Sequence, residues 1–322
     1  MKNKLKTITS FLDDGSSPVD FIINFGDTHL KAVLFLRERL NIPLFYGFRC
    51  NDVDRAHMLR TYGGLGIKEY LFSVLYEPVN RHREKQVAKY AELVSFINNY
   101  DKGRFIARTN PKSSNIVVIP NHIGLPRCKP ELKSTNKSTS LKKLVYVGSL
   151  SQNKGVWDLL KALSILVEKG HNFLECYLLG RMEETDETIR LIKDLNLGNN
   201  VYIEGYKDPF PYFQACDLFV YPTLYDSFGN VIAESLHTGC PVIASSVGGV
   251  TELLSYPELL FQSGNVQEIS DRIEHCITDN NFYNHILTLC SERTVAYQFD
   301  WPDKYKDAII YFRDKNTDKY IT

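Results

Sequence analysis

The chain has 322 residues, which is long for one domain and sufficient for two domains that each bury a core. Apolar residues make up 43% of the chain and charged residues 24%, a composition typical of a soluble globular protein. No run approaches about 18 apolar residues, and the N-terminal segment lacks the apolar core of a secretion signal. The sequence therefore predicts no membrane-spanning helix and a cytoplasmic protein.

The net charge of zero hides an asymmetry between the two halves of the chain. Residues 1–136 hold 21 Lys and Arg against 13 Asp and Glu, a net charge of +8, and residues 137–322 hold 17 against 25, a net charge of −8. Halves of opposite sign suggest two domains with different partners, and the basic half suits an anionic membrane surface or an anionic acceptor. The alternative is a solvated surface with uneven charge.

The N-terminal part of the chain follows a strand-helix-strand pattern. We expect a strand at residues 21–24, a helix at 29–40 and a strand at 44–48, a unit that implies a parallel sheet. A long tyrosine-rich helical region with a basic cluster follows at 68–89. Two short strands are expected within 90–97 and 116–119.

Residues 133–140, KSTNKSTS, are polar and lack large apolar side chains, which predicts a linker. Strands and helices then alternate strictly as far as residue 215. The strands are expected at 144–147, 174–179 and 201–203, each with a glycine at its end, and the helices at 156–169, 187–195 and 210–215. Strict alternation predicts a doubly wound parallel sheet.

The stretch 221–254, YPTLYDSFGNVIAESLHTGCPVIASSVGGVTELL, contains two further strand-turn-helix units. The first follows the apolar run 218–221 and enters a helix that stops at Gly239, and the second follows a strand at 241–244 and turns at Gly248-Gly249. Both helices would begin at the carboxyl ends of adjacent strands. Backbone N–H groups and the helix dipole favour an anion there, such as a nucleotide phosphate.

The run DSFGNVIAE, with carboxylates at Asp226 and Glu234, resembles the E-x7-E element of family 4 retaining glycosyltransferases of the GT-B fold. The resemblance implies that Asp226 faces hydroxyls of the donor sugar and that Glu234 binds the nucleotide ribose. It also implies that the following backbone amides contact the sugar and phosphate, namely those of Phe228, Gly229, Asn230 and Val231. Asp226 occupies the position of the first Glu of the element. For the pair taken alone, the alternative is a helix cap and a solvated helix residue.

The segment GSLSQNKG resembles the G-R-L-x-x-x-K-G element of the same family, in which Arg and Lys neutralise the donor diphosphate. The resemblance implies this role for Lys154, whereas Ser149 stands where the family has Arg. Without the charged hydrogen bond of that Arg, the leaving group loses about 1.5–3 kcal/mol of stabilisation unless another group replaces the Arg. Gly148 and Gly205, at the ends of their strands, are expected to line the donor site with these residues.

Two arginines are further candidates. Arg181 follows the predicted strand at 174–179 and is the candidate substitute for the missing family arginine. Arg49 ends the strand at 44–48, where the family often has a histidine that reaches the donor sugar, and an Arg could make the same hydrogen bonds. His29 and His57 compete for that role. A lone arginine or histidine is otherwise structural or solvated.

A metal site is not expected. Asp52-Val53-Asp54 matches the D-x-D pattern by which GT-A glycosyltransferases bind a divalent metal, but Asp52 is also placed to cap the helix that follows. The glycines at 63–66 do not follow a strand and are no dinucleotide fingerprint. Seven scattered cysteines without a C-x-x-C pair predict reduced core residues.

The first half resembles the later part of the family's acceptor domain, with VVIPNHI standing for its strand-then-Pro-Asn-Gly stretch. Nothing before Phe21 corresponds to the family's first strand and glycine-rich loop, so we expect an abbreviated domain. The segment FDWPDKYKDAIIYFRDKNT resembles the family's terminal helix, which crosses back to the first domain, with Phe299 and Trp301 at the crossing. A plain core aromatic is the alternative for Trp301.

The sequence therefore predicts an α/β protein of the GT-B type, with two doubly wound Rossmann-like domains facing a cleft. Residues 1–135 with the helix 300–322 would form the acceptor side, and residues 140–299 would bind the nucleotide sugar. The predicted activity is metal-independent, retaining transfer of a hexosyl group from a nucleotide sugar, with UDP favoured, to a glycan or lipid-linked acceptor in polysaccharide biosynthesis. No cofactor and no nucleic-acid partner are expected, and the basic half suggests the inner face of the cell membrane.

Two alternatives remain open at this stage. The shortened first domain and the missing arginine suit a catalytically weak glycosyltransferase-like subunit that serves a partner enzyme. A sugar-nucleotide epimerase has a similar two-domain shape, but it would need acid-base groups in the cleft, and the sequence offers no carboxylate pair there beyond Asp226 and Glu234.

Overall fold

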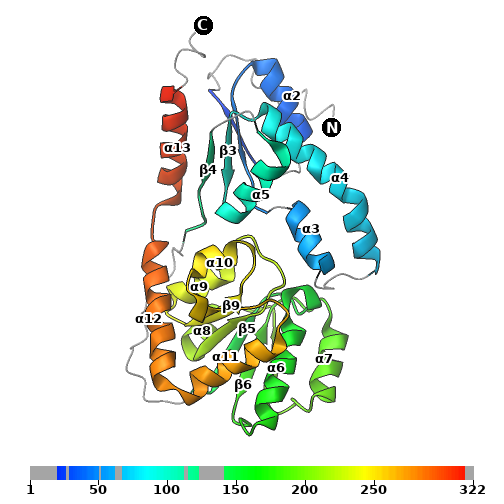
Figure 1. The fold of residues 1–322 in the computed structure, drawn as a ribbon, viewed down its shortest axis with the longest axis vertical. Coiled ribbons are helices and arrows are strands. Elements are labelled where there is room, and N and C mark those ends of the chain that lie inside the picture. The colour runs from blue at the N-terminus through cyan, green and yellow to red at the C-terminus, as the bar shows by residue number, and fades with distance from the viewer. Residues whose placement is uncertain are drawn as a thin grey trace. The chain divides into compact units, whose positions relative to one another are not determined.

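The computed structural model describes residues 20–26, 29–50, 52–61, 67–111, 115–122 and 141–315. The predicted linker at 133–140, the glycines at 63–66 and Cys128 lie outside the described residues. The chain divides into two compact units (Figure 1). The first comprises residues 1–56, 71–120 and 301–322, and the second comprises residues 57–70 and 121–300.

The first unit is built on a four-stranded parallel sheet in the order β1-β2-β3-β4. Its strands are β1 (Ile22–Phe25), β2 (Leu44–Gly47), β3 (Leu93–Phe96) and β4 (Ile116–Val118). The helices α2 (Leu30–Leu40), α5 (Asn99–Thr109) and, at the far end of the sequence, α13 (Trp301–Lys315) lie in this unit. The helices α3 (Asp52–Thr61) and α4 (Ile67–Tyr90) each have residues in both units.

Successive residues of the central strands serve two separate cores on the two faces of this sheet. Tyr46 and Phe96 pack with side chains of α2, α4 and α5 on one face. Phe45 and Leu93 pack against Phe312 of α13 on the other face. Because side chains alternate along a strand, each face needs its own cover. The terminal helix α13 therefore completes the first unit.

The second unit is built on a six-stranded parallel sheet in the order β10-β9-β8-β5-β6-β7. Its strands are β5 (Lys143–Val147), β6 (Glu175–Leu179), β7 (Val201–Gly205), β8 (Leu218–Tyr221), β9 (Val242–Ser245) and β10 (Leu260–Phe261). Its helices are α6 (Val156–Glu168), α7 (Thr185–Asp194), α8 (Phe210–Ala215), α9 (Asn230–His237), α10 (Gly248–Leu254), α11 (Val266–Thr278) and α12 (Asn280–Ala296), with short turns η1 (Gln152–Lys154) and η2 (Pro257–Leu259).

The strand order of the second sheet reverses between β5 and β8. β5 pairs with β6 on one side and with β8 on the other, so the chain builds the sheet outward in both directions from this pair. At such a reversal the loops that leave the two central strands diverge and open a crevice beyond their carboxyl ends, where α/β proteins bind ligands. The predicted α/β alternation is confirmed, and the strand order predicts a ligand site at the loops after β5 and β8.

Candidate functional site

Lys154 and Asp226 meet at the point where the strand order reverses. Lys154 ends η1 in the loop after β5, and Asp226 lies in the loop after β8. The Lys154 Nζ atom lies 3.2 Å from Asp226 Oδ2. The two side chains are 31% and 24% exposed, so the ion pair is partly buried and still open to a ligand. Two residues that the sequence places 72 positions apart are thus neighbours in one site.

A glycine brings these two loops together. Gly155 has a φ of +72°, and a Cβ added to it would lie 1.8 Å from the carbonyl oxygen of Pro222. Next to it, the amide of Leu224 donates to the carbonyl of Asn153 at 3.1 Å. Because only glycine tolerates both the left-handed backbone and this close approach, packing of the main chain fixes where Lys154 stands.

The carboxylate of Asp226 is held by four donors. Its Oδ1 accepts from the amides of Phe228 at 3.0 Å and Gly229 at 2.9 Å, and its Oδ2 accepts from the hydroxyl of Tyr221 at 2.7 Å and from Lys154. Burial raises the pKa of Asp226, but the Lys154 ammonium, the Tyr221 hydroxyl and the two amides outweigh it and hold that pKa below its usual range. Asp226 is therefore ionised and fixed in orientation.

This arrangement changes the assignment of the backbone amides. The sequence assigned the amides of Phe228 and Gly229 to the donor, but in the structure both donate to Asp226. The next two amides, those of Asn230 and Val231 in the first turn of α9, have no hydrogen-bond partner among the residues that the structure describes. Amides in the first turn of a helix are the ones that an anion can use.

Glu234 lies further along α9 and is half-buried. Burial, together with repulsion from the Asp208 carboxylate, raises the pKa of Glu234. Within the described ranges its carboxylate has no hydrogen-bond or ion-pair partner. A carboxylate that is costly to bury and lacks a protein donor is able to accept hydrogen bonds from hydroxyl groups of a ligand.

Three glycines line the edge where β5, β6 and β7 end. A Cβ on Gly180 would lie 1.7 Å from the carbonyl oxygen of Gly148, and the amide of Gly180 donates to the carbonyl of Gly205 at 2.9 Å. Ser149, at the family's arginine position, follows Gly148 and is half-buried. Arg181 follows Gly180 in the loop after β6, the strand next to β5. Its side chain is exposed and makes no hydrogen bond or ion pair in the described part of the chain.

Arg49 belongs to the first unit, where aromatic rings hold it. Its guanidinium lies 5.0 Å from the ring centroid of Phe25 and 4.8 Å from that of Trp301, a cation–π arrangement. Trp301 starts α13 and belongs to the same unit. Phe299 belongs to the second unit, where its ring centroid lies 6.4 Å from that of Tyr297.

Asp54 of the D-x-D motif takes part in a buried ion-pair cluster. It is 1% exposed and lies 2.9 Å from Arg104 Nε and 2.8 Å from Arg108 Nη1, and Arg108 also contacts Glu84 at 2.7 Å. Asp52 is the first residue of α3. No group of three or more His, Cys, Asp or Glu among the described residues is arranged to hold a metal ion.

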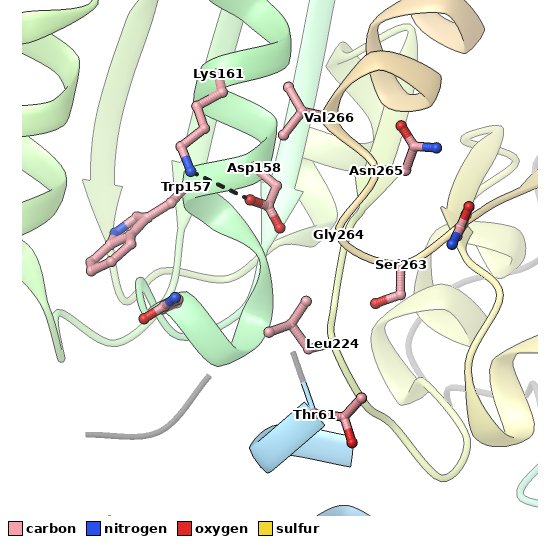
Figure 2. A pocket seen from close by; sticks show the side chains of 11 residues that line it. Thr61, Trp157, Asp158, Lys161, Leu224, Ser263, Gly264, Asn265 and Val266 are labelled. Carbon is pink, nitrogen blue, oxygen red and sulfur yellow. Dashed lines mark ion pairs between the residues drawn. The ribbon is translucent and has the colours of Figure 1, made fainter. Parts of the chain in front are cut away.

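A pocket of about 700 Å³ is bordered by the same two loops that carry Lys154 and Asp226 (Figure 2). It also involves α6 and the loop after β10, and its polar lining includes Gln152, Asp158, Lys161, Gln262 and Asn265. Lys161 Nζ lies 3.8 Å from Asp158 Oδ1. Burial raises the pKa of Asp158 against the opposing effect of Lys161. None of the candidates from the sequence lines this pocket.

The sequence did contain a signal for the third loop of this pocket. The segment LFQSGNVQEI repeats the pattern of a strand, a glycine turn and a capped helix. In the structure, Asn265 caps α11 by accepting from the amide of Glu268 at 3.1 Å. The same pattern that pointed to the loops after β5 and β8 therefore also marks the loop after β10.

The family model described as "Glycosyl transferases group 1" matches residues 129–287, just under half of the chain. The capsular polysaccharide biosynthesis glycosyltransferase CapM of Staphylococcus aureus is 31% identical over 141 residues, which cover 42% of this chain and 37% of that protein. The chain spans less than half the length of the first curated relatives that it matches.

Solved structures resemble the chain over nearly its whole length. Sucrose-phosphate synthase from Thermosynechococcus elongatus matches with a TM-score of 0.77 and 19% identity, covering 99% of this chain and 78% of that one. The Anabaena protein HepE in complex with UDP-glucose matches with a TM-score of 0.72 and 20% identity, covering 96% and 82%. Identities this low show the fold alone, and the chain has the GT-B fold.

Proposed function

We propose that the chain is a glycosyltransferase whose second unit binds a nucleotide sugar at the carboxyl ends of β5 and β8. The observation that carries the proposal is the Lys154–Asp226 ion pair at the reversal of strand order, with Glu234 unpartnered on the helix that follows. An ion pair that only stabilised the fold could lie anywhere, but this one lies at the carboxyl ends of the strands, where α/β proteins bind ligands. A phosphate and a sugar bound there would contact a cation, two helix amides and two carboxylates.

Each group has a role in the transfer. The Lys154 ammonium and the amides of Asn230 and Val231 stabilise negative charge on the departing diphosphate, which is where such preorganised donors lower a barrier most. Asp226 is ionised and accepts hydrogen bonds from hydroxyls of the donor sugar. Glu234 accepts hydrogen bonds from the ribose. Arg181 supplies the second positive charge that Ser149 lacks.

In the proposed reaction the bond from the anomeric carbon to the diphosphate oxygen breaks and a bond from that carbon to the acceptor oxygen forms. The acceptor proton passes to the leaving diphosphate. The resemblance of DSFGNVIAE to a retaining family supports retention of configuration, with attack on the face from which the diphosphate leaves. We propose that no metal takes part, because Lys154 and the helix amides supply the positive charge.

The comparisons support the choice of substrates. The HepE complex holds UDP-glucose, which favours a UDP-hexose as donor. The name of CapM supports a role in polysaccharide biosynthesis. We propose a glycan or lipid-linked acceptor. We propose that the first unit, with α13, forms the acceptor side and that Arg49 serves there. Its excess of Lys and Arg supports work at an anionic membrane surface on the cytoplasmic side.

A panel of UDP-, GDP- and ADP-sugars tests the proposal by thermal shift and by release of free sugar in the absence of acceptor. One donor class should raise the melting temperature, because a ligand at about 100 times its dissociation constant stabilises by about 2.7 kcal/mol. Lys154→Ala should abolish sugar release. Lys143→Ala should leave sugar release unchanged, because it removes a surface lysine of β5 that lies 3.9 Å from Glu175 on the neighbouring strand β6. A panel in which no donor shifts the melt and none is hydrolysed contradicts the proposal.

A further inference from the structure

The first half of α4 exposes large apolar side chains on successive turns. Leu75 is 72% exposed, Ile67 83%, Phe72 57% and Leu71 56%. Four more large apolar side chains of the same segment are exposed, those of Tyr70, Val74, Tyr76 and Val79. Apolar surface of this extent on consecutive helical turns marks an interaction site. Residues 67–79 of α4 are called the apolar arm below.

The arm is anchored at one end and presents apolar side chains on most sides at the other. Val87 and Ala88, near the C-terminal end of α4, lie in the core of the first unit. At the other end of the helix, residues 67–70 are assigned to the second unit, and residues 71–90 to the first. At about 100° per residue, the eight exposed positions spread over about 240° of the helix circumference. The half-buried side chains of Ser73, Glu77 and Asn80 fall in the remaining sector.

The wide spread of exposed apolar side chains around the arm distinguishes a lipid partner from a protein partner. A helix that packs on a protein buries an apolar stripe of roughly 100° or somewhat more and keeps its other side polar. Lys68 is exposed within the same sector, between apolar side chains, so the exposed residues of the arm do not separate into an apolar side and a polar side. A lipid interface, in contrast, can receive apolar side chains over a much wider sector of a helix.

The charge of the rest of α4 fits the same partner. Glu77 is paired with Arg81 at 2.6 Å, and Glu84 is buried against Arg108 at 2.7 Å. Lys85 and Lys89 are exposed on the same helix. The second half of α4 therefore presents positive charge, and an anionic lipid surface attracts each Lys or Arg that lies near it.

We propose that the apolar arm inserts into the interface of an anionic lipid bilayer, with Lys85 and Lys89 on the headgroups. The arm is about 20 Å long, and no helix in the described ranges is long and apolar enough to cross a membrane, so the arm lies in the interface. This inference goes beyond the expectation from charge, because apolar side chains of one helix, inserted into the bilayer, would provide much of the binding free energy. It does not depend on the proposed transfer reaction.

Flotation of the full chain with vesicles tests this inference. The chain should float with phosphatidylcholine vesicles that contain about one third phosphatidylglycerol and stay largely behind with phosphatidylcholine alone. Leu75→Glu should lower the partition coefficient about tenfold or more, because it replaces an inserted apolar side chain by a charge. Val295→Glu is the matched control, since Val295 is 66% exposed on α12, and it should leave binding unchanged. Lys85→Glu with Lys89→Glu should lower binding, most clearly at low salt.

Two outcomes would overturn the inference. The first is that the wild type does not float with anionic vesicles, or that Leu75→Glu floats as the wild type does. The second is that the arm mediates self-association, with the wild type dimeric in sedimentation, Leu75→Glu monomeric and neither bound to vesicles. Far-ultraviolet circular dichroism shows that the variants are folded, and the donor-induced thermal shift of Leu75→Glu should equal that of the wild type. Failure of donor binding and failure of lipid binding are thus observed separately.

Discussion

Replacing Asp226 with alanine removes the acceptor on which the loop after β8 is organised. The carboxylate accepts from two backbone amides, one buried hydroxyl and one ammonium, and α9 begins four residues later, at Asn230. In the alanine variant the amides of Phe228 and Gly229 and the hydroxyl of Tyr221 lose their acceptor at once. We expect the free energy of unfolding to fall, in addition to the loss of the donor-sugar contact.

The magnitude follows from how many donors are left and how far water can replace the carboxylate. A buried donor without an acceptor costs about 1–3 kcal/mol. Asp226 is 24% exposed, so water can reach part of the site and recover some of that cost. Loss of the partly exposed Lys154 pair adds about 1 kcal/mol at most. The expected destabilisation is therefore about 2–4 kcal/mol.

Urea unfolding of Asp226→Ala beside Asp279→Ala measures this difference. Asp279 holds the same pattern at the start of α12, where its Oδ1 accepts from the amides of Asn281 at 2.8 Å and Phe282 at 3.1 Å, but its side chain is 46% exposed. An exposed cap of this kind contributes about 1 kcal/mol. If Asp226→Ala lowers the free energy of unfolding by no more than Asp279→Ala does, burial of the Asp226 site does not have the effect proposed.

The pH dependence gives a second readout of the same variant. The pKa of Asp226 is lower in the folded chain than in the unfolded chain. Its ionised form therefore stabilises the fold at pH values above the unfolded pKa, and this contribution disappears as the pH falls through the folded pKa. The difference in unfolding free energy between the wild type and Asp226→Ala should shrink on acidification below about pH 4. A difference that grows on acidification would show that the sign is wrong.

Three further predictions concern the glycine contact, the buried charges and the ribose carboxylate. Gly155→Ala should lower the free energy of unfolding by about 3 kcal/mol or more in thermal melts, because the added Cβ would lie 1.8 Å from a carbonyl oxygen. The control Gly170→Ala has a φ of +100° but open space around the added Cβ, and it should lower the free energy of unfolding by about 1 kcal/mol. Arg108→Met should cost about 3–5 kcal/mol in urea unfolding, since it leaves two buried carboxylates without their shared partner. Glu234→Gln should raise the free energy of unfolding at neutral pH, because burial disfavours the charged form of Glu234. This gain should vanish in acid, where Glu234 is protonated in both states. A lower free energy of unfolding at neutral pH would contradict a raised pKa for Glu234.

Much of the second unit could be predicted from the sequence because its signals are local. The apolar run 218–221 became β8 with the expected bounds, and glycines end or follow β5, β6 and β7 as expected. The proximity of Lys154 and Asp226 also follows, since the loops after neighbouring parallel strands lie at one edge of a sheet.

The remaining features depend on contacts that a local pattern does not contain. Helix α5 was not predicted because it is short and polar, although Asn98 caps it by accepting from the amide of Asp101 at 2.6 Å. The D-x-D motif gave no sign that Asp54 pairs with Arg108, which lies 54 residues further along. The use of the Phe228 and Gly229 amides by Asp226 needed the shape of the turn, which the sequence alone does not give.

The central claim is that a nucleotide sugar binds at the carboxyl ends of β5 and β8, with Glu234 on the ribose. Titration calorimetry of the donor identified by thermal shift, with wild type, Glu234→Ala and the exposed control Glu187→Ala on α7, tests it most directly. The wild type and Glu187→Ala should each bind one donor per chain. Glu234→Ala should bind the donor about tenfold more weakly or worse, because hydrogen bonds to a charged acceptor contribute about 1.5–3 kcal/mol. Equal donor affinities for Glu234→Ala and the wild type would contradict the central claim.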